Sequence, residues 1–401
     1  MAKRYICLVC RNEIAHPNAE CPYCKARSVI AEGASPRILG MVFGVMAAVF
    51  AVTGFYAKSF KAERSTRGQH HFGVAQELLA EGNHANAIKE YRNALSYAKE
   101  EPDYRLGLAR ALFEDERYAE TENHLVDLRS QDPTSGILNY LLAQLAAKEG
   151  RLDEAVSYYR TAIHGRWEGD TEDRRLNLRL ELVDLLETSG RDEQLAAELI
   201  ALAEIMPDDR GIQHKLGALM LRTQLFDRAS SLFQTLLEAN PRDHEALLGR
   251  GEAEFQLGNY ITARTQYNRA KLVRDDDATN ERIALCNRII ELDPTRRGIS
   301  LRERFRRSRV LIERARAATL KCQNPSGDAF VGPLVALPAD LASALENADQ
   351  ALAGRPGRAT DETVEANTLT AEELWNQASP LCNESTPLDP PLVHVMAKLS
   401  R

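Results

Sequence analysis

The chain has 401 residues, of which 44% are hydrophobic and 27% charged, and its formal net charge is -7 at pH 7. These proportions are typical of a folded protein and exclude a disordered chain. The negative net charge argues against general nucleic-acid binding, so we expect no nucleic-acid partner. The seven cysteines form two sets: four lie close together near the N-terminus and three are far apart.

The N-terminal segment, which we expect to form a domain over residues 1–30, has the cysteine spacing of a metal site. Cys7 and Cys10 form one Cys-x2-Cys pair, and Cys21 and Cys24 form another ten residues later. Four thiolates complete the tetrahedral coordination of zinc, so we expect a closed, structural Zn²⁺ site whose metal supplies most of the folding free energy. Two disulfides or a redox pair are the alternatives. His16 is expected to be a bystander.

Residues 5–25 resemble the short zinc ribbons at the N-termini of many bacterial membrane proteins. In those ribbons a glycine commonly follows each Cys-x2-Cys knuckle, whereas this chain has Arg11 and Lys25 there. The resemblance therefore implies the same metal ligation and leaves the geometry of the two turns open.

A run of twenty residues without a charge, 38–57, predicts a single transmembrane helix. A helix of this length spans roughly 30 Å, the thickness of the hydrocarbon core of a bilayer. Gly40, Gly44 and Ala48 would line one face of that helix, and small residues on one face allow two spans to pair in a homodimer. The alternative is that glycine and alanine are simply common in membrane spans. Residues 58–67 are expected to be a linker.

The orientation of the span rests on redox chemistry, because the flanking charges are balanced. A site of four thiolates persists best where thiols stay reduced, which favours a cytoplasmic zinc ribbon. We therefore expect a single-pass protein of the bacterial inner membrane with a periplasmic body.

Residues 68–277 repeat with a period of 34 residues, which indicates stacked helical hairpins. In the first unit the markers are Ala87, Tyr91 and Ala94, and small residues recur at the matching places of later units, as Ala155, Ala229 and Ala263. These residues resemble tetratricopeptide repeats (TPRs) in six units, which implies an all-α solenoid. The glycines expected to adopt left-handed turns between paired helices are Gly82, Gly150, Gly190 and Gly258.

The resemblance also implies a concave groove lined by the first helix of each hairpin. The residues expected there are Phe72, Gln76, Leu106, Arg110, Phe113, Tyr140 and Gln144, followed by Asp184, His214 and Glu252. The first part of this lining is aromatic and aliphatic with amide groups, which suits a peptide with apolar anchors. The alternative is that these apolar residues belong to the core.

Residues 278–321 are expected to be capping helices. The segment from Arg296 to Lys321 holds nine arginines and two glutamates. A stripe formed by Leu301, Phe305, Ser308, Ile312 and Ala315 would pack on the last repeat, while the arginines would face solvent. Anionic lipid headgroups or an acidic partner are the alternatives for these arginines.

Residues 322–401 are expected to form a helical subdomain and a tail. Cys322 and Cys382 bracket it, and a location outside the cytoplasm would allow a disulfide between them. We expect one helix from Pro338 to Ala353. We expect a second helix from Thr370, with Thr370 and Glu373 forming a capping box.

We find no sequence motif of a serine hydrolase, a zinc protease or a phosphate-binding loop, so we expect no enzyme activity. The sequence favours a membrane-anchored scaffold that binds or assembles protein partners, through peptide segments or within a membrane complex. Two alternatives remain: a regulatory adaptor that presents clients to a membrane enzyme or protease, and a lipid- or polymer-binding subunit of a cell-envelope biosynthetic complex.

Overall fold

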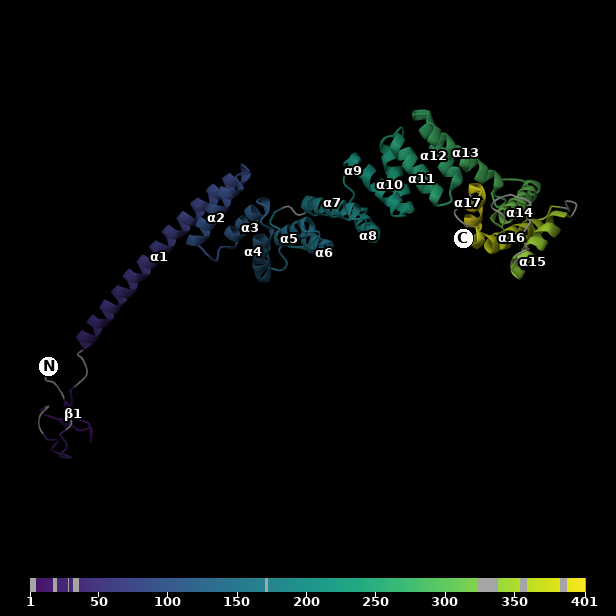
Figure 1. The fold of residues 1–401 in the computed structure, drawn as a ribbon. Coiled ribbons are helices and arrows are strands. Elements are labelled where there is room, and N and C mark those ends of the chain that lie inside the picture. The colour runs from purple at the N-terminus through teal and green to yellow at the C-terminus, as the bar shows by residue number, and fades with distance from the viewer. Residues whose placement is uncertain are drawn as a thin grey trace. The chain divides into compact units, whose positions relative to one another are not determined.

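The computed structural model describes residues 5–16, 20–27, 29–31, 36–169, 172–323, 338–353, 359–382 and 388–400. The chain divides into two compact units, Met1–Gly169 and Asp170–Arg401. Helices dominate both units, as Figure 1 shows.

The first unit begins with a small antiparallel sheet. Its three strands are β1 (Tyr5–Cys7), β2 (Glu13–Ile14) and β3 (Val29–Ala31), in the order β2-β1-β3. Tyr5 lies opposite Ile14 on one side and Ala31 on the other. We call residues 5–31 the cysteine head. Among the side chains of the head that the structure describes, the buried core consists of Cys7, Ile14 and Cys21 with a few partly buried neighbours, so two of its three members are cysteines.

Helix α1 (Pro36–Ala80) runs without interruption from the apolar stretch into the first repeat (Figure 1). The structure thus differs from the expectation of a linker at residues 58–67, which are helical. This segment contains neither glycine nor proline, and a pair between Glu63 and Arg67 at 2.7 Å supports it across one helical turn.

Five further helices complete the first unit: α2 (His84–Tyr97), α3 (Pro102–Glu114), α4 (Tyr118–Gln131), α5 (Gly136–Lys148) and α6 (Leu152–His164). They pair as α1 with α2, α3 with α4, and α5 with α6. The small residues expected between paired helices are fully buried, including Ala87 and Ala155. At Gly107, an added Cβ would lie 2.3 Å from the ring of Tyr91, so the close approach of α2 and α3 requires glycine there.

The second unit starts with three further hairpins and the helix that follows them: α7 (Glu172–Thr188), α8 (Asp192–Leu202), α9 (Arg210–Arg222), α10 (Phe226–Ala239), α11 (His244–Gln256), α12 (Tyr260–Val273) and α13 (Asp277–Leu292). Ala229 and Ala263 are fully buried here. The same spacing of small and large residues thus builds hairpins in both units.

The turns between paired helices have the left-handed conformation that the sequence predicts. Gly82, Gly150, Gly190 and Gly258 have φ values of +76°, +74°, +68° and +81°. Glu116 and Gln224 occupy the same place in the other two hairpins, with φ of 59° and 62°. A residue with a Cβ is disfavoured in this conformation by about 1–2 kcal/mol, so the fold imposes these turns even without glycine.

The chain ends in a helical subdomain built around α14 (Leu301–Gln323). The other elements are α15 (Ala339–Ala353), α16 (Asp361–Ala378), the 3-10 turn η1 (Ser379–Leu381) and α17 (Pro390–Leu399). Ile312 and Ala315 of the expected apolar stripe are fully buried. They belong to a core that joins α14 to α16 and α17 as well as to α13. The stripe therefore packs mainly on helices that follow it in the chain.

Arg302 and Arg306 of α14 are exposed as expected, but five other arginines of this helix are held by neighbouring segments, which corrects the expectation that the arginines as a group face solvent. Arg307 is 6% exposed, and its Nη1 donates a hydrogen bond of 2.6 Å to the carbonyl oxygen of Ile290, at the end of α13. Arg309 donates one of 2.7 Å to the carbonyl of Leu352, at the end of α15. Cations stabilise helix C-termini because the last carbonyls lack partners within the helix. Three further arginines pair with carboxylates, namely Arg304 with Asp361, Arg314 with Asp389 and Arg316 with Asp349.

The expected helix over Pro338–Ala353 is confirmed by α15, but the start of the next helix was predicted nine residues too late. Helix α16 begins at Asp361, after a capping box between Thr360 and Thr363. Thr370 lies inside the helix and donates its hydroxyl to the carbonyl of Ala366. Thr370 with Glu373 matches the usual capping pattern, whereas Thr360 has Thr363 in place of Glu or Gln; the helix still starts at the earlier position, where the first turn packs, with Val364 2% exposed.

Candidate functional site

The four cysteines of the head converge on one point. The Sγ atoms of Cys7 and Cys24 lie 3.4 Å apart, as do those of Cys10 and Cys21. All four sulfur atoms lie within 4.8 Å of one another, and none forms a disulfide. The four thiols could therefore hold one metal ion.

Two equivalent turns bring the thiols together. The backbone N–H of Arg11 donates to the carbonyl of Cys7 at 2.9 Å, and that of Lys25 donates to Cys21 at 2.8 Å. Arg11 and Lys25 have φ of 57° and 54°, so they adopt the left-handed conformation for which glycine is the usual residue. The two turns thus have the same geometry without glycine.

The spacing of the sulfur atoms fits a tetrahedral ion. Zn–S bonds of about 2.3 Å place tetrahedral sulfur ligands about 3.8 Å apart, between the shortest and longest separations found here. Backbone hydrogen bonds from Cys10 and Val9 lower the pKa of Cys7 to about 6, whereas the pKa of Cys24 is raised to about 12, to which its hydrogen bond with Cys7 contributes, so without a metal the cluster holds both thiolate and thiol. His16 is exposed.

In the first unit, the residues expected to line a groove lie on the first helices of the hairpins. The polar ones, Gln76 on α1 and Arg110 on α3, are exposed. The apolar ones are half-buried and contact neighbouring helices: Phe72 stacks on Tyr104 at 4.9 Å, Leu106 packs on the core, Phe113 contacts Tyr118 and Tyr140 contacts Tyr159. Gln144 donates a hydrogen bond of 2.7 Å to the hydroxyl of Tyr140. This surface thus offers aromatic edges and amide groups.

The second unit contains a hollow among α9, α11, α12 and α13. Its residues are Leu221, Leu248, Gly249, Glu252, Tyr267, Arg274, Asp276, Ala278, Thr279 and Arg282. Glu252 accepts a hydrogen bond of 3.0 Å from the hydroxyl of Tyr267 and pairs with Arg282 at 2.8 Å. Burial raises the pKa of Tyr267, as does Glu252, so the tyrosine remains a hydrogen-bond donor. The hollow combines an aliphatic wall with a fixed ion pair.

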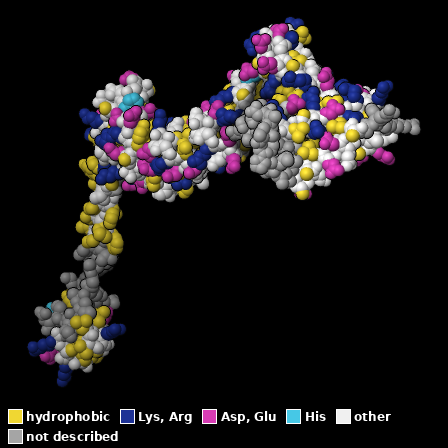
Figure 2. Space-filling view, turned by 45° about the vertical axis from the view of Figure 1, so that its right-hand side comes forward, with side chains coloured by type: hydrophobic (Ala, Val, Ile, Leu, Met, Phe, Trp, Pro, Cys, Tyr) yellow, Lys and Arg dark blue, Asp and Glu magenta, His cyan; other side chains and the backbone are white. Residues whose placement is uncertain are grey.

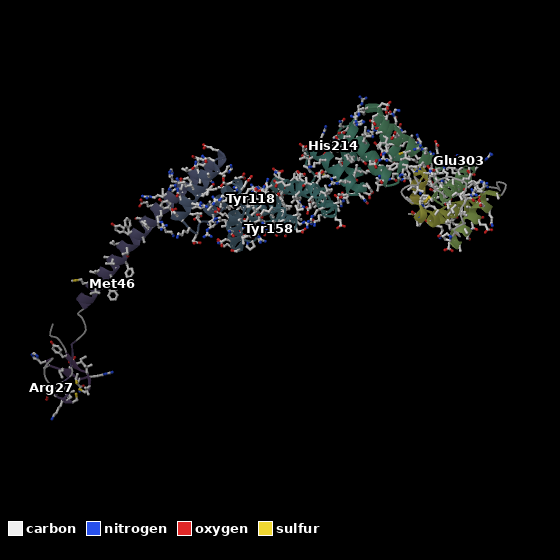
Figure 3. The ribbon with its side chains drawn as sticks, viewed as in Figure 1. Arg27, Met46, Tyr118, Tyr158, His214 and Glu303 are labelled. Atoms are coloured by element: carbon white, nitrogen blue, oxygen red, sulfur yellow. A yellow bond between two sulfur atoms is a disulfide. The ribbon has the colours of Figure 1, made fainter. Side chains whose placement is uncertain are left out.

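Only Glu252 of this hollow was expected from the sequence. The missed signal is the period of 34 residues, since His214, Leu248 and Arg282 are successive steps of it. Extending the 34-residue repeat by one step beyond residue 277, the last residue of the predicted repeats, would have placed Arg282 on the same face as Leu248. At the first of these positions, His214 (labelled in Figure 3) forms a hydrogen bond of 2.9 Å with Asp243.

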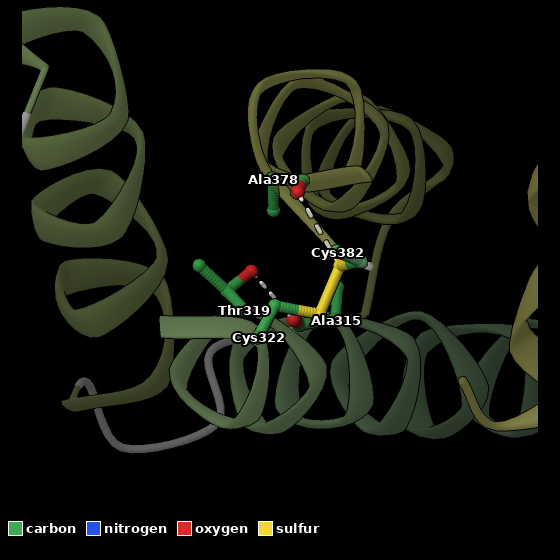
Figure 4. Close-up of a disulfide and its surroundings, with 5 residues drawn as sticks. All are labelled: Ala315, Thr319, Cys322, Ala378 and Cys382. Atoms are coloured by element: carbon green, nitrogen blue, oxygen red, sulfur yellow. Dashed lines mark hydrogen bonds between the residues drawn. A yellow bond between two sulfur atoms is a disulfide. The ribbon is translucent and has the colours of Figure 1, made fainter. Parts of the chain in front are cut away.

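Cys322 at the end of α14 and Cys382 after η1 form a disulfide, with Cα atoms 4.8 Å apart (Figure 4). Thr319 donates its hydroxyl to the carbonyl of Ala315 one turn before the bond. Cys286 is a fully buried free thiol, and burial raises its pKa to about 11, which makes it unreactive at neutral pH.

Among the described residues, α1 is the one helix long and apolar enough to cross a membrane. None of its apolar window is buried, and Met46 projects from a bare stretch of helix (Figure 3). An added Cβ at Gly40 or Gly44 would meet nothing within 4 Å, and Ala48 is exposed. The pairing of two spans along this face stays a prediction.

Comparison with known protein families identifies the helical hairpins. A sequence model described as tetratricopeptide repeat matches residues 122–171 and 215–281, and a second model of the same description matches residues 78–145. The chain contains tetratricopeptide repeats. These repeats form the helical solenoid predicted from the sequence, and the matched family is a family of interaction repeats with no enzymatic signature.

The similarity to individual proteins is limited. A stretch of 62 residues is 39% identical to Superkiller protein 3 of Schizosaccharomyces pombe, which is 16% of this chain and 4% of that protein. The TPR protein YrrB, described as having an unusual peptide-binding site, is 16% identical, with coverage of 47% of this chain and 94% of YrrB and a TM-score of 0.35. A TPR protein from Parabacteroides merdae is 11% identical, with coverage of 76% and 99% and a TM-score of 0.35.

Proposed function

We propose that this TPR protein is a non-catalytic, membrane-anchored scaffold that binds protein partners through the faces lined by the first helices of its repeats. The continuous course of α1 carries this proposal. The helix enters the first repeat directly, where Arg64 donates a hydrogen bond of 3.0 Å to the carbonyl of Ser96 in α2. Arg64 lies only seven positions, roughly 10 Å of helix, beyond Ala57 at the end of the apolar stretch. A partner bound by the first repeats would therefore lie close to the membrane.

The binding surface that we propose has two parts, one in each unit. The half-buried aromatic residues of α1, α3 and α5 offer apolar anchor sites, and Gln76, Arg110 and Gln144 offer polar edges. In the second unit, Leu221 and Leu248 offer an aliphatic wall beside the ion pair of Glu252 and Arg282. Such surfaces suit a peptide segment with apolar side chains and at least one charged group.

We assign zinc to the cysteine head as a structural ion. Four thiolates leave no open position for a substrate, so the ion would stabilise the head and supply no chemistry. A reduced thiolate site favours the cytoplasm, and the disulfide between Cys322 and Cys382 favours an oxidising compartment for the C-terminal subdomain. These two preferences support a single span in the bacterial inner membrane with the repeats in the periplasm.

The arginine-rich helix supported the lipid- or polymer-binding alternative. Five of its arginines are bound by carbonyls and carboxylates of α13 and the C-terminal subdomain, which weakens that alternative. A client-presenting adaptor would use the same repeat surface as a scaffold, and the duration of partner binding distinguishes the two.

Crosslinking from the hollow of the second unit tests the proposed scaffold. We expect that a photoreactive phenylalanine analogue at Leu221 or Leu248 captures the same partner in cells that make the full-length protein. The matched control is the analogue at Thr265, an exposed residue of α12 that does not line the hollow. Equal capture from Thr265 would contradict the assignment of this surface.

Truncation of Leu248 in the aliphatic wall tests whether this surface contributes to the affinity for the partner. We expect Leu248→Ala to weaken partner recovery about tenfold, because an apolar anchor contributes about 1.5–3 kcal/mol when it is fully buried. Thr265→Ala should leave recovery unchanged. Thermal unfolding of both variants distinguishes lost binding from lost folding, and unchanged recovery with Leu248→Ala would count against the hollow as the binding site.

A further inference from the structure

The two metal-binding turns of the cysteine head present apolar side chains to solvent. Leu8 and Val9, between Cys7 and Cys10, are 53% and 67% exposed, and Tyr23, between Cys21 and Cys24, is 69% exposed. We call Leu8, Val9 and Tyr23 the knuckle tips. None of the three belongs to the buried cluster of the head or packs against it. Large apolar side chains at both tips indicate a surface that becomes covered when the protein is in place.

Basic side chains follow each tip. Arg11 and Lys25 come directly after the last cysteine of each pair, and both are exposed. Arg27 is also exposed and pairs with Glu20 at 3.1 Å. In the face of the head visible in Figure 2, hydrophobic side chains lie in the middle and Lys and Arg side chains lie at the rim. Residues 1–37 contain six Lys and Arg against three Glu, although the whole chain is negative.

The chain itself keeps the head near the start of α1. Strand β3 ends at Ala31 and α1 begins at Pro36. Five steps between consecutive Cα atoms, each 3.8 Å, span at most about 19 Å. The apolar stretch begins at Ile38, two residues into the helix, so a membrane that holds α1 lies within this reach of the head.

We propose that the cysteine head docks on the surface of the bilayer that holds α1. The knuckle tips enter the headgroup region, and Arg11 and Lys25 contact the phosphates of anionic lipids. The inference rests on the proposed membrane anchor. Apolar side chains beside basic ones are the combination that binds anionic membrane surfaces. The short connection adds a high effective concentration, which allows a weak interaction to persist.

The geometry favours lipid over a protein partner because the lipid surface is already within reach. Headgroup phosphates also complement the positive charge of residues 1–37, whereas the acidic remainder of the chain lies beyond the apolar stretch. The docked head would lie on the membrane surface beside the N-terminal end of α1.

Fluorescence quenching by lipid tests the docking in the full-length, zinc-loaded protein. Val9→Trp places an indole at one knuckle tip without altering a cysteine, and the unsubstituted protein gives the background from Trp167 and Trp375. The protein is reconstituted into vesicles that contain equal amounts of phosphatidylglycerol and phosphatidylcholine brominated near the headgroup. We expect blue-shifted emission and strong quenching of the added indole. Emission typical of an indole in water, without quenching, would overturn the proposal.

Two further variants test the role of the basic residues and the depth of the span in the bilayer. Arg11→Asn combined with Lys25→Asn removes both charges, and asparagine tolerates the left-handed turn. One basic residue contributes about a fivefold change in membrane binding, so the double variant should lower the ratio of docked to free heads about 25-fold. Unchanged quenching in that variant would overturn the role of the two charges. Met41→Trp, three residues inside the apolar stretch, marks the headgroup end of the span. If Met41→Trp is quenched and Val9→Trp is not, docking alone is overturned, whereas failure of both overturns the anchor.

Discussion

Replacement of Cys10 by serine is expected to unfold the cysteine head and to leave the helical repeats folded. Among the described side chains of the head, Cys7, Ile14 and Cys21 form the buried core, and two of these three are cysteines of the metal cluster, so the fold of the head depends on the metal. Binding of a structural zinc ion contributes about 10–16 kcal/mol at pH 7, and the loss of one thiolate removes much of this free energy. The zinc content of the purified protein should fall from one ion per chain to well below one.

Trypsin sensitivity gives a second readout of the same variant. Arg11 and Lys25 lie in the two folded turns, and unfolding of the head should let the backbone at both enter the protease and be cleaved rapidly, while far-ultraviolet circular dichroism stays near that of the unsubstituted protein. His16→Ala is the matched control, because His16 is exposed in the same head. A full zinc complement in Cys10→Ser, or loss of zinc in His16→Ala, would contradict the proposed set of ligands.

Reduction of the Cys322–Cys382 disulfide is expected to destabilise the C-terminal subdomain by about 4 kcal/mol. The bond joins cysteines separated by 60 residues, and the chain-entropy model gives about this value for a loop of that length. Trp375 is partly buried against the core of the subdomain, so its fluorescence reports unfolding in urea. The midpoint of the unfolding transition should fall when a reductant is added.

The double variant Cys322→Ala, Cys382→Ala supplies the control for this experiment. Its unfolding midpoint should equal that of the reduced protein and should not respond to reductant. Cys286 is a buried free thiol in both proteins and therefore does not account for a difference between them. An unchanged midpoint on reduction of the unsubstituted protein would show that the disulfide contributes no stability.

The hairpins could be predicted because their determinants are local and periodic. A small residue such as Ala87 or Ala263 and a glycine such as Gly82 or Gly258 recur at fixed spacing, and the structure places them at helix contacts and left-handed turns. The cysteine spacing likewise predicted a cluster, because two residues between cysteines allow both thiols of a pair to point to one ion.

The C-terminal subdomain was less predictable because its contacts join residues far apart in the chain. The expected solvent-facing arginines find partners such as Asp389, 75 residues after Arg314, and the sequence does not encode that pairing as a spacing. Residues 58–67, expected as a linker, are helical, because good helix formers without a breaking residue continue α1 through them.

The side of the membrane on which the repeats lie is the most direct test of the proposed architecture. Thr265→Cys adds an exposed thiol to the repeats, and the unsubstituted protein gives the background from the native cysteines. We predict that a membrane-impermeant maleimide labels Thr265→Cys in right-side-out spheroplasts before lysis, and that mass spectrometry recovers Cys322 and Cys382 as one disulfide-linked pair. Labelling only after lysis, with both native cysteines recovered as free thiols, would place the repeats in the cytoplasm and contradict the account.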